Sequence, residues 1–307
     1  MEPPRHFLPV RPPCGGRLTL MDANSATNAA AIFEEQRPFL RSLAYRMLGS
    51  LADAEDIVQE AWLRWARVPL AEVDVPRSFL AKTVTRLCLD YLNSARVRRE
   101  SYVGEWLPEP VADDPAEPGS DEVSYAMLHA MERLTPLERA AFLLHDVFAE
   151  SFEEIGDFLS RTPETCRQLA SRARKHLKAE APRHPVEAGA GRRLATAFLK
   201  AARGGDLAGL KQLLLDDAIL LSDGGGVVRA ALWPIYGSDR IARMYESLTR
   251  RNRIPDEVRE VHFNGLDGLA YIREGKVSDL MLFEPWEDKI GRMYVMRNPE
   301  KLVRSGA

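Results

Sequence analysis

The sequence predicts a multi-domain protein in which two all-α domains are followed by an α+β domain. Apolar residues recur at three- and four-residue steps over about 29–99 and again over about 123–179, which is typical of amphipathic helices. Alternating, strand-like runs appear from Glu257 onward, and segments rich in proline, glycine and acidic residues separate these stretches. At 307 residues, with 45% hydrophobic and 28% charged residues, the chain is long enough for several packed cores.

The composition excludes several classes of protein. Cys14, Cys88 and Cys166 lie far apart without a CxxC pair, which argues against a disulfide framework and a zinc site and fits a reducing cytoplasm. A net charge of -3 argues against coating nucleic acid by bulk charge. No apolar run approaches the roughly 18–20 residues that span a bilayer. We therefore expect a cytoplasmic protein with no membrane segment, no metal and no cofactor.

The chain begins with a segment that we expect to be disordered. Residues 1–27 mix proline, glycine and arginine and lack the continuous apolar stretch of a signal peptide. Met21 is an alternative start of translation.

The first helical domain, residues 28–100, has an acidic surface and a basic one. Along LADAEDIVQEAWLRW one helix face is apolar, and the other carries Asp56, Gln59, Glu60 and Leu63, a pattern that suits a basic protein partner. An ordinary solvated helix explains that stretch equally well. The following stretch, PRSFLAKTVTRLCLDYLNSARVRRE, is rich in arginine and includes Tyr91. Cations can follow a phosphate backbone and an aromatic ring can stack on an unpaired base, although a tyrosine is more often a core residue.

Residues 101–122 form a linker, and residues 123–180 are predicted to contain a helix-turn-helix. Thr135-Pro136 and Thr162-Pro163 each start a helix, and Ser160-Arg161 provides the turn. On the last helix one narrow stripe is apolar, and the opposite face offers side chains suited to base edges and phosphates: Arg167, Gln168, Ser171, Arg172 and Lys175. A solvated helical face is the alternative for the charged residues alone.

Together these motifs resemble regions 2 and 4 of the extracytoplasmic-function sigma factors of the sigma-70 family. The resemblance covers roughly residues 28–180 and implies that core RNA polymerase and promoter DNA are the partners. It implies that Asp56, Gln59, Glu60 and Leu63 bind the clamp helices of core polymerase, and that the helix from Pro163 reads the -35 element. The linker motif WLPEP, residues 106–110, would thread along polymerase. The -10 element would be melted and read by the basic segment, with a loop near Leu92–Arg98, through Arg86, Tyr91, Asn93, Arg96, Arg98 and Arg99.

After a second linker, residues 181–191, the domain of residues 192–307 reads as two helices and an antiparallel meander. We expect helices around 194–203 and 207–214, and turns at Asp267-Gly268 and Glu274-Gly275. This order resembles the SnoaL-like cone, which one subgroup of these sigma factors carries at the C-terminus. The subgroup's two motifs correspond here to Asp223, Gly224, Gly225 and Gly226 and to Asn298, Pro299, Glu300, Lys301 and Leu302. Val227 departs from a common basic residue, and Glu300 replaces an Asp.

The resemblance implies that this domain regulates the sigma factor in cis, and it leaves open whether it activates or inhibits. The glycine run lacks the Gly-Lys-Ser/Thr ending of a P-loop, so we do not expect a phosphate site. The resemblance implies a hinge or a contact between this domain and the sigma factor, where glycines allow backbones to approach closely. A generic turn is the alternative. Because the SnoaL-like fold also hosts enzymes, the candidate general bases are Asp223, Asp239, His262 and Asp279. None forms a recognisable local pair, so we predict no catalysis. The alternative function is a pocket that senses or converts a small-molecule ligand, with the DNA-binding part as its output.

Overall fold

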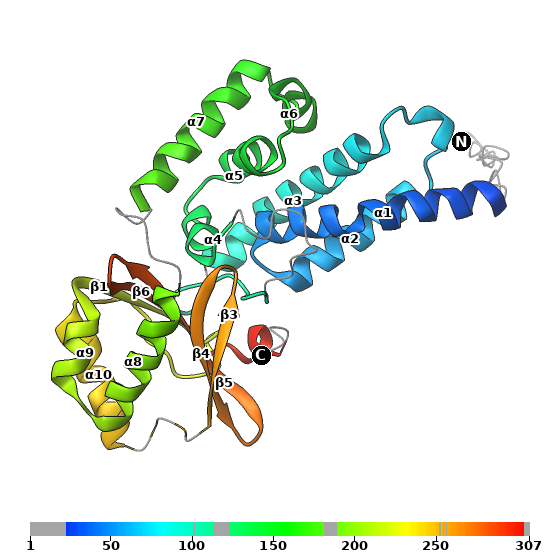
Figure 1. The fold of residues 1–307 in the computed structure, drawn as a ribbon. Coiled ribbons are helices and arrows are strands. Elements are labelled where there is room, and N and C mark those ends of the chain that lie inside the picture. Colours follow the sequence, from blue (N-terminus) through cyan, green and yellow to red (C-terminus); the bar gives the residue numbers. More distant parts are fainter. Residues whose placement is uncertain are drawn as a thin grey trace, which may run out of the picture.

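The computed structural model describes residues 23–100, 102–112, 123–180, 189–251, 253, 255 and 257–303 (Figure 1). Most of the predicted leader lies outside these residues, and the first helix begins at Ala23, before the expected boundary. Among the described residues, no helix is long and apolar enough to cross a membrane.

The first helical domain is built from three long helices, α1 (Ala23–Leu48), α2 (Leu51–Trp65) and α3 (Pro76–Glu100), with a 3-10 turn at Leu70–Glu72. Ser50 caps α2, because its side chain accepts a hydrogen bond from the amide of Asp53. The loop predicted near Leu92–Arg98 is wrong, since α3 continues through this segment to Glu100. Its Arg, Leu and Ala residues favour helix, and no glycine or proline interrupts them.

The second helical domain contains the predicted helix-turn-helix. Its elements are α4 (Tyr125–Met131), α5 (Pro136–Phe142), a π-helical turn η2 (Leu143–Val147), α6 (Phe152–Leu159) and α7 (Pro163–Glu180). Thr135 and Glu138 form a capping box at the start of α5, so the predicted N-cap is confirmed. Helix α6 ends at Ser160, whose φ of +54° lies in the left-handed region, and this residue makes the tight turn into α7.

The two helical domains share one hydrophobic core rather than two. Phe39 and Leu43 of α1 and Val84 of α3 belong to the same buried cluster as Phe142 of α5 and Phe158 of α6. The closed packing of these domains follows from this shared core.

The C-terminal domain is a curved sheet with helices on one side (Figure 1). The meander predicted from the sequence is confirmed, because β3 to β6 pair in order and antiparallel. Strand β1, which the sequence analysis did not identify, pairs parallel with β6, so the strand order is β2-β1-β6-β5-β4-β3. The elements are α8 (Ala190–Gly204), α9 (Leu207–Leu213), β1 (Leu214–Asp223), β2 (Ile235–Tyr236), α10 (Ser238–Arg250), β3 (Val258–Phe263), β4 (Leu266–Arg273), β5 (Lys276–Trp286), β6 (Lys289–Met296) and α11 (Pro299–Leu302).

One of the two predicted hairpin turns is in the wrong place. Glu274 and Gly275 form the β4–β5 turn, with φ of +51° and +73°. Asp267 and Gly268, however, lie inside β4, and the β3–β4 turn is made by Asn264-Gly265, with φ of +46° and +73°. Asn-Gly is the pair best suited to a two-residue turn with both φ angles positive.

The two faces of the sheet bury different partners. Leu269 and Tyr271 point into the cluster beneath α8 and α10, whereas Ala270 and Ile272 point to the opposite face. On that opposite face the cluster includes Leu107 of the linker and Tyr125 of α4. The sheet therefore packs its own helices on one side and the linker with the start of the second helical domain on the other.

Candidate functional site

Helix α7 exposes the residues predicted to read DNA. Its inner stripe is buried: Cys166, Leu169, Ala170, Ala173 and Leu177. The outer residues are all exposed: Arg167, Gln168, Ser171, Arg172 and Lys175. The amphipathic pattern thus places the predicted face toward solvent.

Several cations of α7 are engaged by acidic neighbours. The Arg172 Nε lies 3.3 Å from Glu138 Oε1, and Arg167 pairs with Glu153 at 3.2 Å. Arg174, which the sequence analysis left out of the site, donates two hydrogen bonds to Asp146, at 2.7 and 3.0 Å. These pairs hold the guanidinium groups in place on the surface.

The outer face of α2 carries the residues predicted to bind core polymerase. Asp56, Gln59 and Leu63 are exposed, Leu63 to 49%, and Glu60 is half-buried beside Arg64, which donates to it at 3.0 Å. The opposite face of α2 is buried, so this acidic face with one exposed leucine is available to a partner.

The basic segment predicted to face the -10 element is partly covered by the second helical domain. Arg86 donates from Nε to the Phe158 carbonyl at 3.1 Å and from Nη2 to Ser160 Oγ at 3.0 Å. Lys82 Nζ lies 2.7 Å from Asp157 Oδ2. The C-terminal end of α6 therefore occupies two cations of α3.

The remaining predicted residues of α3 differ in their exposure. Tyr91 is half-buried and packs against the shared core, and Asn93 is exposed. Arg96, Arg98 and Arg99 lie in α3, but their side chains are outside the described part of the chain.

The linker of residues 102–112 meets the buried carboxylate of Asp223 at the end of β1. This carboxylate accepts hydrogen bonds from the Tyr102 hydroxyl at 2.6 Å, the Leu107 amide at 3.0 Å and the Gly225 amide at 2.9 Å. Lys301 Nζ lies 2.7 Å from it and also donates to the Leu107 carbonyl. Asp223 is 0% exposed and Lys301 6%, so a buried ion pair ties the linker to both motifs of the C-terminal domain.

Burial and charge perturb the groups around Asp223. Burial lowers the pKa of Lys301, and the opposing effect of Asp223 does not fully offset it. Burial and then the Asp223 carboxylate raise the pKa of Tyr102, so its hydroxyl stays protonated and donates. The ammonium of Lys301 also lies over the Trp106 ring, 4.0 Å from its centroid, in cation–π contact.

The glycine run and the C-terminal motif touch one another and the linker. A side-chain carbon at Gly225 would lie 2.6 Å from the Asn298 side chain, and the φ of Gly225 is +66°. A carbon at Gly226 would lie 3.4 Å from Val103 Cβ. Asn298 caps α11 and donates from Nδ2 to the Tyr102 hydroxyl at 3.1 Å. The glycines thus allow a close approach of backbone to Asn298 and Val103.

The far end of the linker binds the first helical domain and the β3–β4 turn. Glu109 Oε2 accepts from the amide of Leu51, at the N-terminus of α2, at 2.7 Å. Tyr45 donates to the Glu109 carbonyl at 2.7 Å. Asn264 Oδ1 accepts from the Val111 amide at 2.8 Å. These contacts involve residues that the sequence analysis did not assign. Glu109 lies in the WLPEP motif, but no local signal identifies its partners.

A third contact joins the linker, α4 and the sheet. His129 of α4 is 5% exposed; its Nε2 lies 3.6 Å from Glu105, and its ring centroid lies 5.4 Å from that of Tyr294 of β6. The nearby His129 lowers the pKa of Glu105. Tyr125 donates to the Pro108 carbonyl at 2.7 Å, and its ring packs edge-on against Tyr294. We call residues 102–112 with their partners Asp223, Asn264, Asn298 and Lys301 the linker seam.

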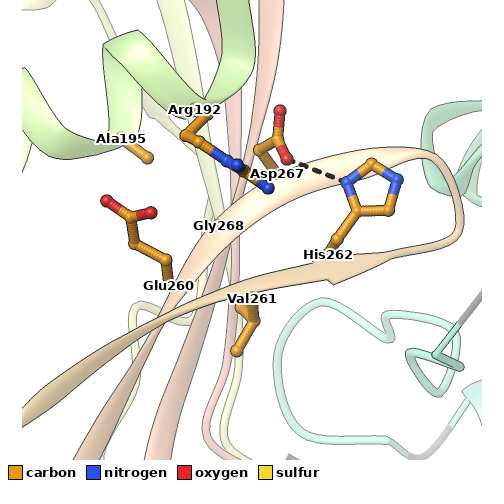
Figure 2. A pocket seen from close by; sticks show the side chains of 7 residues that line it. All are labelled: Arg192, Ala195, Glu260, Val261, His262, Asp267 and Gly268. Carbon is orange, nitrogen blue, oxygen red and sulfur yellow. Dashed lines mark hydrogen bonds and ion pairs between the residues drawn. The ribbon is translucent and has the colours of Figure 1, made fainter. Parts of the chain in front are cut away.

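His262 forms a pair that the sequence analysis did not identify. Its Nδ1 lies 2.8 Å from Asp267 Oδ1 across the β3–β4 hairpin, beside a cavity of about 220 Å³ that Arg192 and Glu260 also line (Figure 2). His262 is half-exposed. The two residues face each other in the strand register, which explains why no sequence motif reveals the pair.

The other candidates for general bases are bound to cations. Asp239 is half-exposed between Lys211 and Arg243, and these neighbours lower its pKa. Asp279 pairs with Arg297 at 2.5 Å. Asp223 pairs with Lys301, so all three candidate carboxylates, Asp223, Asp239 and Asp279, are paired with cations.

Comparison with known protein families gives matches to both helical domains. Residues 32–98 match the family model of sigma-70 region 2, and residues 124–177 match that of sigma-70 region 4.

Curated relatives and a solved structure extend the likeness into the C-terminal domain. The chain is 41% identical over 234 residues to the ECF RNA polymerase sigma factor SigJ of Mycobacterium tuberculosis, covering 71% of this chain and 72% of the relative. It is 36% identical to the probable ECF RNA polymerase sigma factor SigI of the same species, covering 60% and 66%. The crystal structure of SigJ superposes with a TM-score of 0.73 at 32% identity, covering 90% of this chain and 99% of that one.

Proposed function

This chain is an extracytoplasmic-function RNA polymerase sigma factor of the sigma-70 family, and we propose that its C-terminal domain holds it closed by binding its own linker. As a sigma factor it binds core RNA polymerase and directs promoter-specific initiation of transcription. We assign it to the cytoplasm, where core polymerase and DNA are found.

We assign the partner surfaces to three helices. The exposed acidic face of α2 with Asp56, Gln59, Glu60 and Leu63 binds core polymerase, because exposed acid around an exposed leucine complements a basic, partly apolar surface. The outer face of α7 reads the -35 element, and α3 contacts the -10 element. Exposed Gln168 and the cations of α7 support the first DNA assignment, since amides and guanidinium groups pair with base edges.

The observation that carries the regulatory proposal is the capture of the linker by Asp223 and Lys301. The resemblance to sigma factors implies that the linker runs along polymerase, so it has to leave the sheet when the holoenzyme forms. Leu107 is 0% exposed in the seam, and both its amide and its carbonyl are hydrogen-bonded there. A linker held in this way is not available to polymerase, so the seam inhibits formation of the holoenzyme.

The engaged cations of α3 support the same conclusion. Arg86 and Lys82 are hydrogen-bonded to Phe158, Ser160 and Asp157, so a contact to phosphate has to compete with these partners. Full access of DNA to these cations therefore requires the end of α6 to release them as well as the C-terminal domain to release the linker.

We assign no catalytic step to the C-terminal domain. Its helix-covered face is filled by buried side chains, including Phe198, Tyr245 and Phe283. The His262–Asp267 pair lies near the surface instead. If His262→Ala changes transcription without affecting the folded state, a sensing role for that cavity becomes the better account.

The proposal is tested by transcription with added core polymerase, using DNA from upstream of the protein's own gene. We would compare the full chain, a chain ending after Pro185 and a chain lacking residues 298–307, which include Asn298 and Lys301. The shorter deletion removes the cation and the cap of the seam and should raise transcription. The chain ending after Pro185 also exposes Leu107 and Tyr125, so its folded state needs a separate check.

Equal transcription by the full chain and the chain lacking residues 298–307 would contradict inhibition by the seam. If none of the three chains gives a promoter-dependent transcript, the DNA upstream of the protein's own gene is not its promoter.

A further inference from the structure

One end of the C-terminal domain gathers basic side chains from four separate segments. They come from the ends of α8 and α10, the segment leading into β3 with β3 itself, and the β4–β5 turn. We call them the basic end, and all are exposed: Arg203, Arg250, Arg251, Arg253, Arg259, Arg273 and Lys276. The segment between α10 and β3 and the β4–β5 turn lie on the side of the domain away from the helical domains (Figure 1).

Hydrogen bonds hold this end in a defined shape. Arg203 Nη2 donates to the Pro255 carbonyl at 3.3 Å, and Arg273 Nη2 donates to the Arg253 carbonyl. The Thr249 hydroxyl of α10 donates to the Ala202 carbonyl of α8, which fixes the ends of the two helices together. The segments that carry the basic side chains are therefore held near one another and are not independent loops.

Acidic residues offset only part of this charge. Glu246 pairs with Arg250 at 3.4 Å, and Glu257 pairs with Arg259 at 2.8 Å. Within the described ranges, Arg251, Arg253 and Lys276 take part in no ion pair. Like charges held close together repel, so a fixed cluster of this kind favours a polyanionic partner.

Helix dipoles do not account for the cluster. A cation in the last turn of a helix is favoured by the negative end of the dipole, which explains Arg203 and Arg250. Arg253, Arg273 and Lys276 lie outside helices, and no helix end explains their position. The chain as a whole is acidic, with a net charge of -3, so the cluster is a local departure from its average.

We propose that the basic end binds the phosphate backbone of DNA without reading its sequence. This inference rests on the proposed function, because the same chain then has α7 bound to a promoter and brings the basic end to nearby DNA at high effective concentration. Arginine and lysine contacts to phosphate give affinity and salt dependence but no base specificity.

The chain is long enough for this contact. Residues 181–189, between α7 and α8, span at most about 32 Å when fully extended. Helix α8 has 15 residues, which corresponds to a length of about 22 Å, and Arg203 lies at its far end. The basic end can thus reach DNA within about 54 Å of the end of α7, or about 16 base pairs at 3.4 Å each.

The test measures binding of the full chain, without polymerase, to a 30-base-pair DNA duplex of mixed sequence at several salt concentrations. The variant is Arg251→Glu/Arg253→Glu. The matched control is Arg192→Glu/Arg240→Glu, which makes the same change in net charge in the same domain but at the first turns of α8 and α10. Circular dichroism and thermal unfolding establish that all three proteins fold.

We expect the Arg251→Glu/Arg253→Glu variant to bind more weakly, with a slope of log K against log salt that is smaller by about 1.8, the loss of two phosphate contacts. The control variant should keep the wild-type slope. An unchanged slope in the test variant, or an equal loss in the control, would overturn the proposal. So would a loss of affinity for DNA-free core polymerase with DNA binding intact, which would identify a protein partner. Because the assay needs neither polymerase nor a promoter, its failure is distinct from failure of the proposed sigma activity.

Discussion

Replacing Lys301 by Met should open the linker seam while leaving the C-terminal domain folded. Lys301 is 6% exposed, and its ammonium lies 2.7 Å from Asp223 and donates to the Leu107 carbonyl. Methionine keeps much of the length and apolar contact of the side chain but leaves the Asp223 carboxylate without its cation. The substitution therefore isolates the ion pair from the packing around it.

The size of the effect follows from the partners that remain. Removing one member of a buried ion pair costs about 3–5 kcal/mol. Asp223 keeps the Tyr102 hydroxyl and the amides of Leu107 and Gly225 as donors, so we expect the lower end, about 3 kcal/mol. At about 1.4 kcal/mol per factor of ten, the equilibrium between closed and open seam shifts about 100-fold toward open.

Hydrogen exchange of the Leu107 amide measures this opening directly, because that amide donates to Asp223 only in the closed seam. We expect its exchange to accelerate about 100-fold, with protection in β5 and β6 unchanged. Transcription by the holoenzyme should rise at limiting core polymerase, and Lys200→Met, on the exposed face of α8, should change neither measurement. In Asp223→Asn/Lys301→Met the buried charge is gone as well, so the opening should be smaller than the single changes add up to.

Unchanged exchange at Leu107 in a folded Lys301→Met protein would refute the reasoning about the ion pair. Faster exchange without higher transcription would show that the seam opens but does not limit activity.

Three further predictions concern the helical domains. Gln168→Ala should cost about 1–3 kcal/mol at one base contact and relax specificity at that position, measured by holoenzyme binding to a promoter library; a uniform loss on all sequences would mean that the residue contacts phosphate only. Asp56→Arg should weaken binding to core polymerase without changing thermal unfolding, and an unaltered dissociation constant would remove α2 from the interface. Asp157→Lys places a cation against Lys82 and Arg86 and should release both for contact with phosphate while the shared core keeps the helical domains packed, seen as stronger DNA binding with unchanged thermal unfolding; wild-type DNA binding would mean that these contacts do not compete with DNA.

The sequence alone predicted the structural features that depend on local residue patterns. Thr135 with Glu138 three residues later predicts a helix start, and the structure has a capping box there. Alternation in the strands predicted the meander, and helical periodicity predicted the buried stripe of α7. The resemblance to a sigma factor with a SnoaL-like domain led us to expect that the glycine motif is a hinge or a contact with the sigma factor. That role stays a prediction, and Asp223 lies against Tyr102 and Leu107 of the linker.

The features that were missed depend on residues far apart in the chain. Tyr45 and Glu109 are joined by a hydrogen bond, as are Tyr102 and Asp223, and no periodicity marks such pairs. The His262–Asp267 pair depends on strand register, which the misplaced turn at Asp267-Gly268 concealed. Occupation of Arg86 by the end of α6 depends on how two domains pack, a property of their shared core and not of either sequence alone.

The most direct test of the central claim is to lock the seam covalently. A Cβ at position 226 would lie 3.4 Å from Val103 Cβ, close to the separation of about 3.5–4.5 Å in disulfides. The φ of Gly226 is +72°, so a cysteine there costs about 1–2 kcal/mol, and the single variant Gly226→Cys measures this cost in thermal unfolding. The Val103→Cys/Gly226→Cys chain should therefore form a disulfide across the seam. With core polymerase, we predict that the oxidised double variant gives no promoter-dependent transcript and that the reduced protein does, while each single cysteine variant is indifferent to oxidation. Equal transcription by the oxidised and reduced double variant would contradict the claim that the linker has to leave the C-terminal domain.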